Sequence, residues 1–99
     1  MIKHIVLLKI KPEITSREIG KMYETLFQLK DLIPGIKSIF GGKNNSPEQK
    51  SKSYTESFIM EFEDGSARDV YLSHQKHKEF AETYILPIID DIIVFDFEY

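Results

Sequence analysis

Hydrophobic residues at the start of the chain predict a β-strand over residues 2–11. All the positions of its centre, residues 5–8, are apolar, whereas a strand with one wet face alternates between apolar and polar side chains. Pro12 ends the strand because its ring leaves no N–H for the ladder. Both faces of this strand must therefore be covered. One face carries His4, Val6, Leu8 and Ile10, and the other carries Lys3, Ile5, Leu7, Lys9 and Lys11.

The next apolar positions follow the spacing of a helix. Thr15 and Glu18 fit the N-cap and N3 positions of a capping box, which places the start of this helix. Apolar residues then recur at helical intervals as far as Ile33. Pro34 and Gly35 cannot continue the helix, so we expect it to stop before them.

The remaining pattern predicts strands and short helices in alternation. A polar stretch at residues 43–53, rich in Asn and Ser, indicates an exposed hairpin loop. On the strand that follows, Glu56 is a carboxylate in an apolar row, which indicates a pocket or a sheet edge. Pro87 breaks the last helix or ends it. The predicted elements are strands over residues 36–42, 54–62 and 91–99, and helices over residues 66–74 and 76–86.

The resulting order, β-α-β-β-α-β, predicts an α+β fold of the ferredoxin-like type. Right-handed crossovers give an antiparallel sheet with both helical layers on one face. The first and last strands are apolar on both faces, however, and the helices can cover only one. An open apolar sheet face is unusual for a monomer. We therefore predict a homodimer in which two sheets pack face to face and form a barrel.

Composition narrows the class of protein. The 99 residues are enough for a single domain, residues 1–99. A net charge of −3 argues against a nucleic-acid partner, because such proteins carry a basic excess. The lack of cysteine excludes disulfides, thiolate metal sites and a cysteine nucleophile. With no apolar run of membrane length and no signal-peptide pattern, we expect a soluble cytoplasmic protein with no membrane partner.

The candidate chemistry lies in the second helical stretch. His77 is suited to proton transfer, because an imidazole can act as acid and base near neutrality. Tyr71 could donate a hydrogen bond to a developing enolate oxygen. Each has a structural alternative: His77 as a satisfied histidine of the core or its rim, and Tyr71 as an amphipathic helix residue with a wet hydroxyl. We expect His74 to close the first helical segment by bonding a terminal carbonyl.

A metal site is the competing idea for the histidines. His74 and His77 are spaced i, i+3, and His4 and Glu56 could complete a set of ligands. Such spacing is common without a metal, and a helix break between the two residues would separate their rings. We therefore predict no metal and no other cofactor.

Several segments together resemble one known family, the stress-responsive A/B barrel domain (Dabb, or dimeric α+β barrel) family. The resemblance extends over nearly the whole chain and implies a homodimer of the ferredoxin-like type. Most members have no assigned reaction, and some plant members accumulate under stress. The segments that carry the resemblance are His4 to Lys11, Ile33-Pro34-Gly35-Ile36, Gly41-Gly42, Tyr54-Thr55, Phe62-Glu63-Asp64, Tyr71-Leu72-Ser73-His74 with His77, and Val94-Phe95-Asp96-Phe97.

The resemblance also implies roles for individual residues. One plant member closes a linear polyketide by an intramolecular aldol condensation, and its catalytic histidine and tyrosine match His77 and Tyr71. A histidine of its first strand, lining the same cavity, matches His4. Two departures put that substrate in doubt: Gln75 replaces the proline that is usual between the two helical histidines, and Glu56 replaces a cavity histidine.

The sequence thus predicts a small apolar cavity between the helices and the sheet. In the leading hypothesis, the protein is a homodimer of unassigned role that binds a small, partly apolar ligand there. The family suggests a role in stress physiology. The second hypothesis is a cyclase or lyase acting on a carbonyl compound, with His77 as general base and Tyr71 as hydrogen-bond donor. The third is a structural dimer without chemistry. The predicted lining residues are His4, Glu56, Tyr71 and His77, with Tyr23, Phe27, Phe58 and Tyr84 as aromatic walls.

Overall fold

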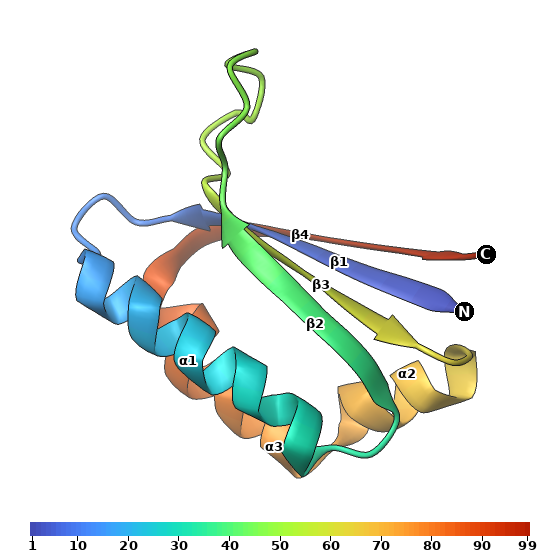
Figure 1. The fold of residues 1–99 in the computed structure, drawn as a ribbon. Coiled ribbons are helices and arrows are strands. Elements are labelled where there is room, and N and C mark those ends of the chain that lie inside the picture. The colour runs from blue at the N-terminus through green and yellow to red at the C-terminus, as the bar shows by residue number, and fades with distance from the viewer.

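The strands form one antiparallel sheet in the order β2-β3-β1-β4 in the computed structural model, which describes residues Met1–Tyr99. The first strand along the chain therefore lies between β3 and β4, and it pairs with both. All the helices lie on one face of the sheet (Figure 1). This arrangement confirms the predicted ferredoxin-like α+β fold. The strands are β1 (Ile2–Ile10), β2 (Ile36–Lys43), β3 (Glu56–Phe62) and β4 (Ile89–Glu98), and the helices are α1 (Ser16–Leu32), α2 (Gly65–Ser73) and α3 (Gln75–Phe80).

α1 begins and ends where the sequence predicts. The Thr15 hydroxyl accepts a hydrogen bond from the Glu18 N–H, and the Glu18 carboxylate accepts from the Thr15 N–H, so the capping box is confirmed. The buried side chains of the helix are Met22, Leu26 and Leu29, which lie on one stripe facing the sheet. None of the helices combines the length and the hydropathy that a membrane span requires.

The second helical layer is more broken than predicted. A break at His74 separates α2 from α3, as expected, but α3 ends at Phe80 rather than continuing as an α-helix to residue 86. A π-helical turn, Ala81–Ile85, and a 3₁₀ turn, Leu86–Ile88, follow it. Pro87 lies within the 3₁₀ turn and cannot donate to an α-helical ladder. The chain passes from this turn directly into β4.

The core lies between the helices and the sheet. It includes one face of β1 (Ile2, Val6 and Leu8) and one face of β3 (Phe58, Met60 and Phe62). His4 and Glu56 are the two buried polar side chains, and both lie on these same strand faces. The buried layer between helices and sheet is therefore apolar except at these two side chains.

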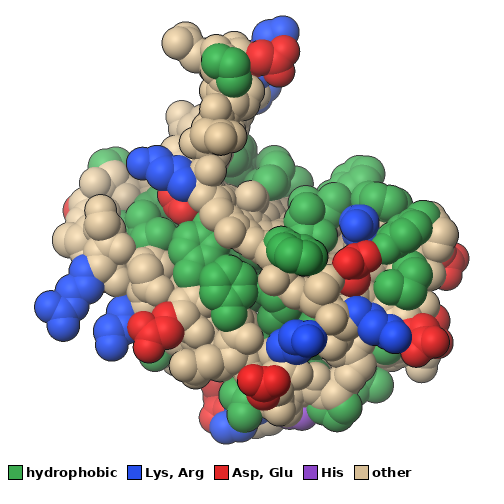
Figure 2. All heavy atoms as spheres, viewed as in Figure 1, with side chains coloured by type: hydrophobic (Ala, Val, Ile, Leu, Met, Phe, Trp, Pro, Cys, Tyr) green, Lys and Arg blue, Asp and Glu red, His purple; other side chains and the backbone are tan.

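The opposite face of the sheet is open and largely apolar. Ile5 of β1 pairs with Ile59 of β3 and with Phe95 of β4, and side chains of paired residues point to the same face. Phe95 is 61% exposed and Phe40 of β2 is 65% exposed. Figure 2 shows hydrophobic side chains gathered on the side of the sheet that lies away from the helices. The remaining apolar members of this face are Leu7, Ile93 and Phe97.

β4 presents alternate residues to two different surroundings. Ile93, Phe95 and Phe97 belong to the open face, as their pairing with Leu7, Ile5 and Lys3 shows. Ile92, Val94 and Asp96 point to the face that the helices cover, where they pair with Leu8, Val6 and His4. Ile92 and Val94 nevertheless stay exposed, because β4 is an edge strand that the helices only partly reach.

The polar segment between β2 and β3, residues 44–55, projects from one end of the sheet away from the helices (Figure 1). Its base is fixed to the sheet by the Thr55 N–H, which donates to the Leu8 carbonyl at 3.0 Å, and by the Asn44 N–H, which donates to the Thr55 carbonyl at 2.8 Å. The predicted exposed loop is confirmed. β3 accordingly starts at Glu56, two residues later than the pattern indicates.

Candidate functional site

A cavity of about 190 Å³ lies between the second helical layer and the β4 side of the sheet. It is mostly apolar, and its polar side chains are His4 from β1, Tyr71 from α2 and His77 from α3. The exposed side chains of Leu72 and Val94 stand on its helical and sheet sides. The apolar lining residues are Val6, Phe58, Leu72, Phe80, Ala81, Ile85, Ile92 and Val94.

Tyr71 is the central side chain of this cavity. It is only 1% exposed, and its ring contacts His4 edge-on with centroids 5.7 Å apart and His77 at 4.4 Å. Its hydroxyl makes no hydrogen bond within the chain, and no side-chain polar atom is both fully buried and unpaired, so this oxygen is accessible from the cavity. Burial raises the pKa of the phenol, so the hydroxyl keeps its proton. A protonated, unpaired donor is thus held at the cavity.

His77 has one ring nitrogen engaged and the other free. Its Nδ1 lies 3.0 Å from the carbonyl oxygen of Leu72, one of the last carbonyls of α2. Carbonyls at a helix end lack partners within the helix, so the break at His74 leaves this oxygen free to accept. Burial lowers the pKa of His77 from its ordinary value of 6.5, with smaller contributions from His4 and Lys78. Near neutral pH the ring is therefore uncharged.

His4 is held by a carboxylate and an arginine. Its Nδ1 lies 2.8 Å from Oδ1 of Asp96, and Oδ2 of Asp96 accepts from Nη1 of Arg68 at 3.2 Å. Asp96 lies opposite His4 in the β1–β4 register, and Arg68 reaches it from α2. This chain of contacts fixes the orientation of the imidazole, in the way that outer carboxylates orient functional histidines in general.

Asp96 and Arg68 were not among the residues predicted from the sequence. Asp96 follows Ile92 and Val94 on one face of β4 and precedes Glu98, so the row changes there from apolar to acidic; that change was the available signal. Arg68 offers no comparable signal, because a single arginine on a short amphipathic helix is ordinary.

His74 has a different role from the one predicted. Its Nδ1 accepts a hydrogen bond from the Lys76 N–H at 3.0 Å, so the side chain caps the start of α3. The prediction that the imidazole bonds a carbonyl at the end of α2 is wrong; the His74 backbone N–H makes that contact, to the Tyr71 carbonyl. An acceptor at this position satisfies an N–H that has no helical partner.

Glu56 lies apart from the histidines. It is opposite Leu8 in the register, whereas His4 is opposite Met60 at the other end of the strand. The residue is 4% exposed, and its carboxylate accepts a hydrogen bond from the Tyr23 hydroxyl at 2.9 Å. Glu56 therefore pairs with neither His4 nor His77, and the prediction that it lines the same cavity as these histidines is wrong. Burial and this carboxylate together raise the pKa of Tyr23.

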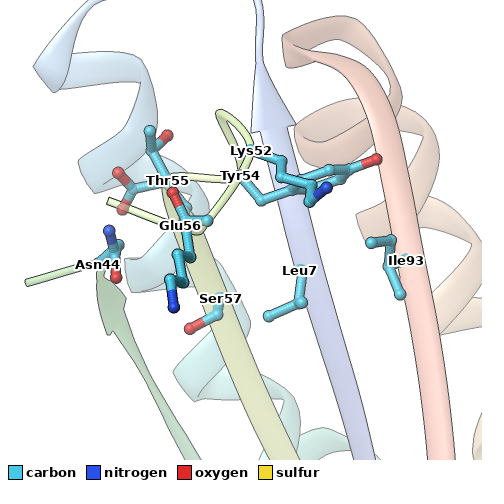
Figure 3. Close-up of a pocket in the computed structure, with 10 residues that line it drawn as sticks. Leu7, Asn44, Lys52, Tyr54, Thr55, Glu56, Ser57 and Ile93 are labelled. Atoms are coloured by element: carbon cyan, nitrogen blue, oxygen red, sulfur yellow. The ribbon is translucent and has the colours of Figure 1, made fainter. Parts of the chain in front are cut away.

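Glu56 instead borders a second hollow of about 320 Å³, under the base of the loop of residues 44–55 (Figure 3). Its floor includes Leu7 and Ile93 of the open sheet face. The Tyr54 ring lies across β1, and its hydroxyl donates to Asp91 of β4. This hollow is more polar than the histidine cavity and belongs to the open face of the sheet.

The predicted aromatic walls divide in the same way. Phe58 lines the histidine cavity, but Tyr23, Phe27 and Tyr84 do not. Phe27 is exposed and stacks on Tyr23 with ring centroids 6.0 Å apart. Tyr84 stacks on Phe80 and borders a groove beside α1. Helical spacing alone could not distinguish the side of the helix facing the cavity from the side facing α1.

No group of three or more His, Cys, Asp or Glu side chains lies close enough together to hold a metal ion. The proposed ligands separate because His74 caps α3, Glu56 bonds Tyr23, and His4 bonds Asp96. What the arrangement can do is form hydrogen bonds and transfer protons through two imidazoles and one phenol.

Comparison with known proteins places the fold and the site in context. Olivetolic acid cyclase from Cannabis sativa is 28% identical over 96 residues, covering 97% of this chain and 94% of the cyclase. A stress-response A/B barrel domain-containing protein from Arabidopsis thaliana is 30% identical over 95 residues, covering 96% of this chain and 83% of that protein.

Solved structures agree with these relatives. The crystal structure of an Arabidopsis thaliana protein superposes with a TM-score of 0.93 at 29% identity, covering 100% of this chain and 95% of that one. A dimeric ferredoxin-like protein of unknown function from Jannaschia superposes with a TM-score of 0.85 at 28% identity, covering 99% and 98%. The sequence model of the family named stress responsive A/B barrel domain (Dabb) matches residues 2–99 of this chain. The chain therefore belongs to the stress-responsive A/B barrel domain family.

Proposed function

We propose that this protein binds a small, partly apolar molecule in the cavity formed by His4, Tyr71 and His77. The observation that carries the proposal is the Tyr71 hydroxyl, which is protonated, accessible from the cavity and without a hydrogen-bond partner in the chain. A ligand oxygen can accept this hydrogen bond while the apolar part of the ligand fills the rest of the space. A few convergent polar groups in an apolar cavity are typical of small-molecule sites.

Ligand titration followed by amide NMR tests this proposal. Compounds with an aromatic ring and one polar group should shift the signals of α2 and α3 saturably. Val94→Trp should block the cavity from its exposed side and abolish these shifts. Val70→Trp places the same ring on an exposed position of α2 that does not line the cavity, and binding should survive. If no compound of this kind binds the wild-type protein, the proposal fails.

Catalysis is a second candidate, favoured by the 4.4 Å separation of the Tyr71 and His77 rings. His77 Nε2 would remove a proton from the carbon next to a carbonyl, and the Tyr71 hydroxyl would stabilise the enolate oxygen. The enolate carbon would form a bond to a second carbonyl, whose oxygen would regain a proton from His77. The name of the cannabis relative, a cyclase, supports this class of reaction.

The catalytic candidate requires turnover. Candidate carbonyl substrates, including polyketide-like diketones, should be consumed by the wild-type protein and not by His77→Ala. Tyr71→Phe should bind the substrate and slow its conversion by a factor of about 10² or more, the usual range for a lost oxyanion donor. Equal turnover by wild type and His77→Ala contradicts the assignment of His77 as base.

The same proposal includes a homodimer that covers the open sheet face. An apolar row crosses this face from Phe40 through Ile59 and Ile5 to Phe95, with exposed Phe97 beside it. Contiguous apolar patches of this kind mark interaction sites. Polar contacts border the row at both ends, Lys3 with Glu61 and Tyr54 with Asp91. An apolar centre with a polar rim is the ordinary composition of a protein interface. The Jannaschia relative, described as dimeric, supports this assembly.

A purely structural dimer is the remaining alternative, and a cavity on which three polar side chains converge counts against it. The cytoplasmic location stays a prediction from composition. The role in stress physiology is proposed from the family alone.

A further inference from the structure

The two imidazoles of the cavity are engaged through the same ring nitrogen. Nδ1 of His77 lies 3.0 Å from the Leu72 carbonyl oxygen, and Nδ1 of His4 lies 2.8 Å from the Asp96 carboxylate. Neither ring makes a hydrogen bond through Nε2 within the chain. The contacts of the two residues come from different elements, so the shared pattern is not the result of one local motif.

These partners determine where the ring hydrogens lie. A backbone carbonyl and an ionised carboxylate only accept hydrogen bonds, so Nδ1 carries the hydrogen in both rings. In a neutral imidazole the other nitrogen, Nε2, then presents a lone pair. In its neutral form, each ring therefore offers Nε2 as a hydrogen-bond acceptor.

The lining of the cavity offers no partner to a charged ligand. No Lys or Arg side chain lines it, and Arg68 is engaged by Asp96 at 3.2 Å and by Asp69 at 3.1 Å. The apolar surroundings of His77 disfavour the charged form of its imidazole. The cavity therefore favours an uncharged ligand.

Tyr71 supplies the third polar atom. Its hydroxyl makes no hydrogen bond to either imidazole, so the cavity offers two acceptor nitrogens and one hydroxyl that can donate. A ligand oxygen without a hydrogen can accept from Tyr71 but leaves both imidazole nitrogens unpaired. A ligand hydroxyl can accept from Tyr71 and donate to an imidazole at the same time.

We propose that the cavity selects uncharged molecules whose polar group carries a hydrogen, namely alcohols, phenols or enols, over ethers and ketones of the same size. The proposal rests on the ligand-binding function proposed above and names its ligand class. Discrimination of this kind is strong, because a buried polar group that the wrong ligand leaves unpaired loses its hydrogen bonds to water without replacement. The volume of about 190 Å³ suits a single aromatic ring with a short substituent, since apolar cavities of about 150 Å³ hold benzene.

Three isomeric probes test the selection. p-Cresol and benzyl alcohol carry an O–H, whereas anisole has the same atoms and no O–H. Titration of the wild-type protein by NMR or calorimetry should give at least about tenfold tighter binding of p-cresol or benzyl alcohol than of anisole, the ratio that one unpaired polar group produces. His77→Phe should reduce this ratio, and Tyr71→Phe should weaken binding of both kinds of probe. Tyr84→Phe, outside the cavity, should change neither.

The outcomes separate the two proposals. If anisole binds as tightly as its isomers, the selection for O–H groups is wrong and the ligand-binding function stands. If none of the three probes binds saturably, both are wrong. A long-range ¹H–¹⁵N spectrum of the unliganded protein provides an independent check. It should show hydrogen on Nδ1 of His4 and His77, and hydrogen on Nε2 of both neutral rings would overturn the inference.

Discussion

Nδ1 of His4 and Oδ1 of Asp96 lie 2.8 Å apart although 92 positions separate the two residues in the chain. The contact joins the central strand to the edge strand directly beside the cavity. Asp96 also holds Arg68 of α2, so one carboxylate links two strands and a helix. The orientation of the cavity imidazole therefore depends on a long-range polar contact.

Asp96→Asn should loosen this connection. The amide keeps the shape of the side chain but removes the charge that both partners use, and we expect a loss of about 1–2 kcal/mol in the free energy of unfolding. Asp69→Asn is the matched control, because Asp69 contacts the same Arg68 but lies at the surface. The control should cost less than about 0.5 kcal/mol in urea unfolding. Equal losses would mean that Asp96 contributes only a surface ion pair.

The pH dependence of stability should report His77. Its pKa is lower in the folded protein than in the unfolded chain, so between the two values the unfolded chain binds more protons. The contribution of the neutral ring is fully present above about pH 6.5 and is lost as the pH falls through the lowered folded-state pKa. Unfolding measured from pH 8 to pH 5 should show a shallower decline for His77→Phe than for wild type. An unchanged slope would contradict the shift.

The open sheet face should be the dimer interface. Phe95→Asp places a charge in the apolar face and should give a monomer in sedimentation velocity at micromolar concentration. Phe27→Asp introduces the same charge at an exposed position of α1, on the other side of the molecule, and should leave the dimer intact. A wild-type protein that sediments only as a monomer would remove the dimer proposal.

Gly41 and Gly42 of β2 should respond differently to alanine. A Cβ on Gly41 would lie 2.8 Å from the Ser57 carbonyl oxygen and 2.9 Å from the Phe58 Cβ, whereas a Cβ on Gly42 would meet nothing within 4 Å. Gly41→Ala should cost about 1–3 kcal/mol, the usual range for overpacking, and Gly42→Ala should be close to neutral. Thermal unfolding of the two variants measures the difference, and similar melting temperatures would show that β2 moves to make room.

Tyr23→Phe should destabilise the protein through Glu56. The hydroxyl of Tyr23 is the hydrogen-bond donor to this buried carboxylate, and its loss should cost about 1–3 kcal/mol. Tyr84→Phe removes a hydroxyl that bonds nothing in the chain and serves as the control. Chemical denaturation distinguishes the two. The prediction fails if both variants are as stable as wild type.

The sequence predicted the fold well because its signals are local. The capping box at Thr15, the stop at Pro34-Gly35 and the apolar runs each depend on a few neighbouring residues. The open face also followed from the pattern, because two strands are apolar on both sides and helices can cover only one. These features do not require knowledge of which strands meet.

The candidate site was predicted only in part because its contacts depend on register and on helix rotation. His4, Tyr71 and His77 do lie together. Glu56 lies apart from them, because it is opposite Leu8 whereas His4 is opposite Met60. The alternation of side chains along a strand shows which face a residue occupies, but not which residue of the neighbouring strand it pairs with. The Asp96–Arg68 contact requires the β1–β4 register. Nδ1 of His74 accepts a hydrogen bond from the first turn of α3, and this contact could not be predicted without knowing where α3 begins.

The alternation of β4 makes this strand unusually sensitive to insertion or deletion. A shift of one residue in its pairing with β1 would exchange its two rows, because successive side chains point to opposite faces. Phe95 or Phe97 would then enter the cavity, and Asp96 would leave His4 and emerge among the apolar side chains of the open face. Single-residue length changes in β4 should therefore be selected against more strongly than in the polar loop of residues 44–55, where added residues remain in solvent.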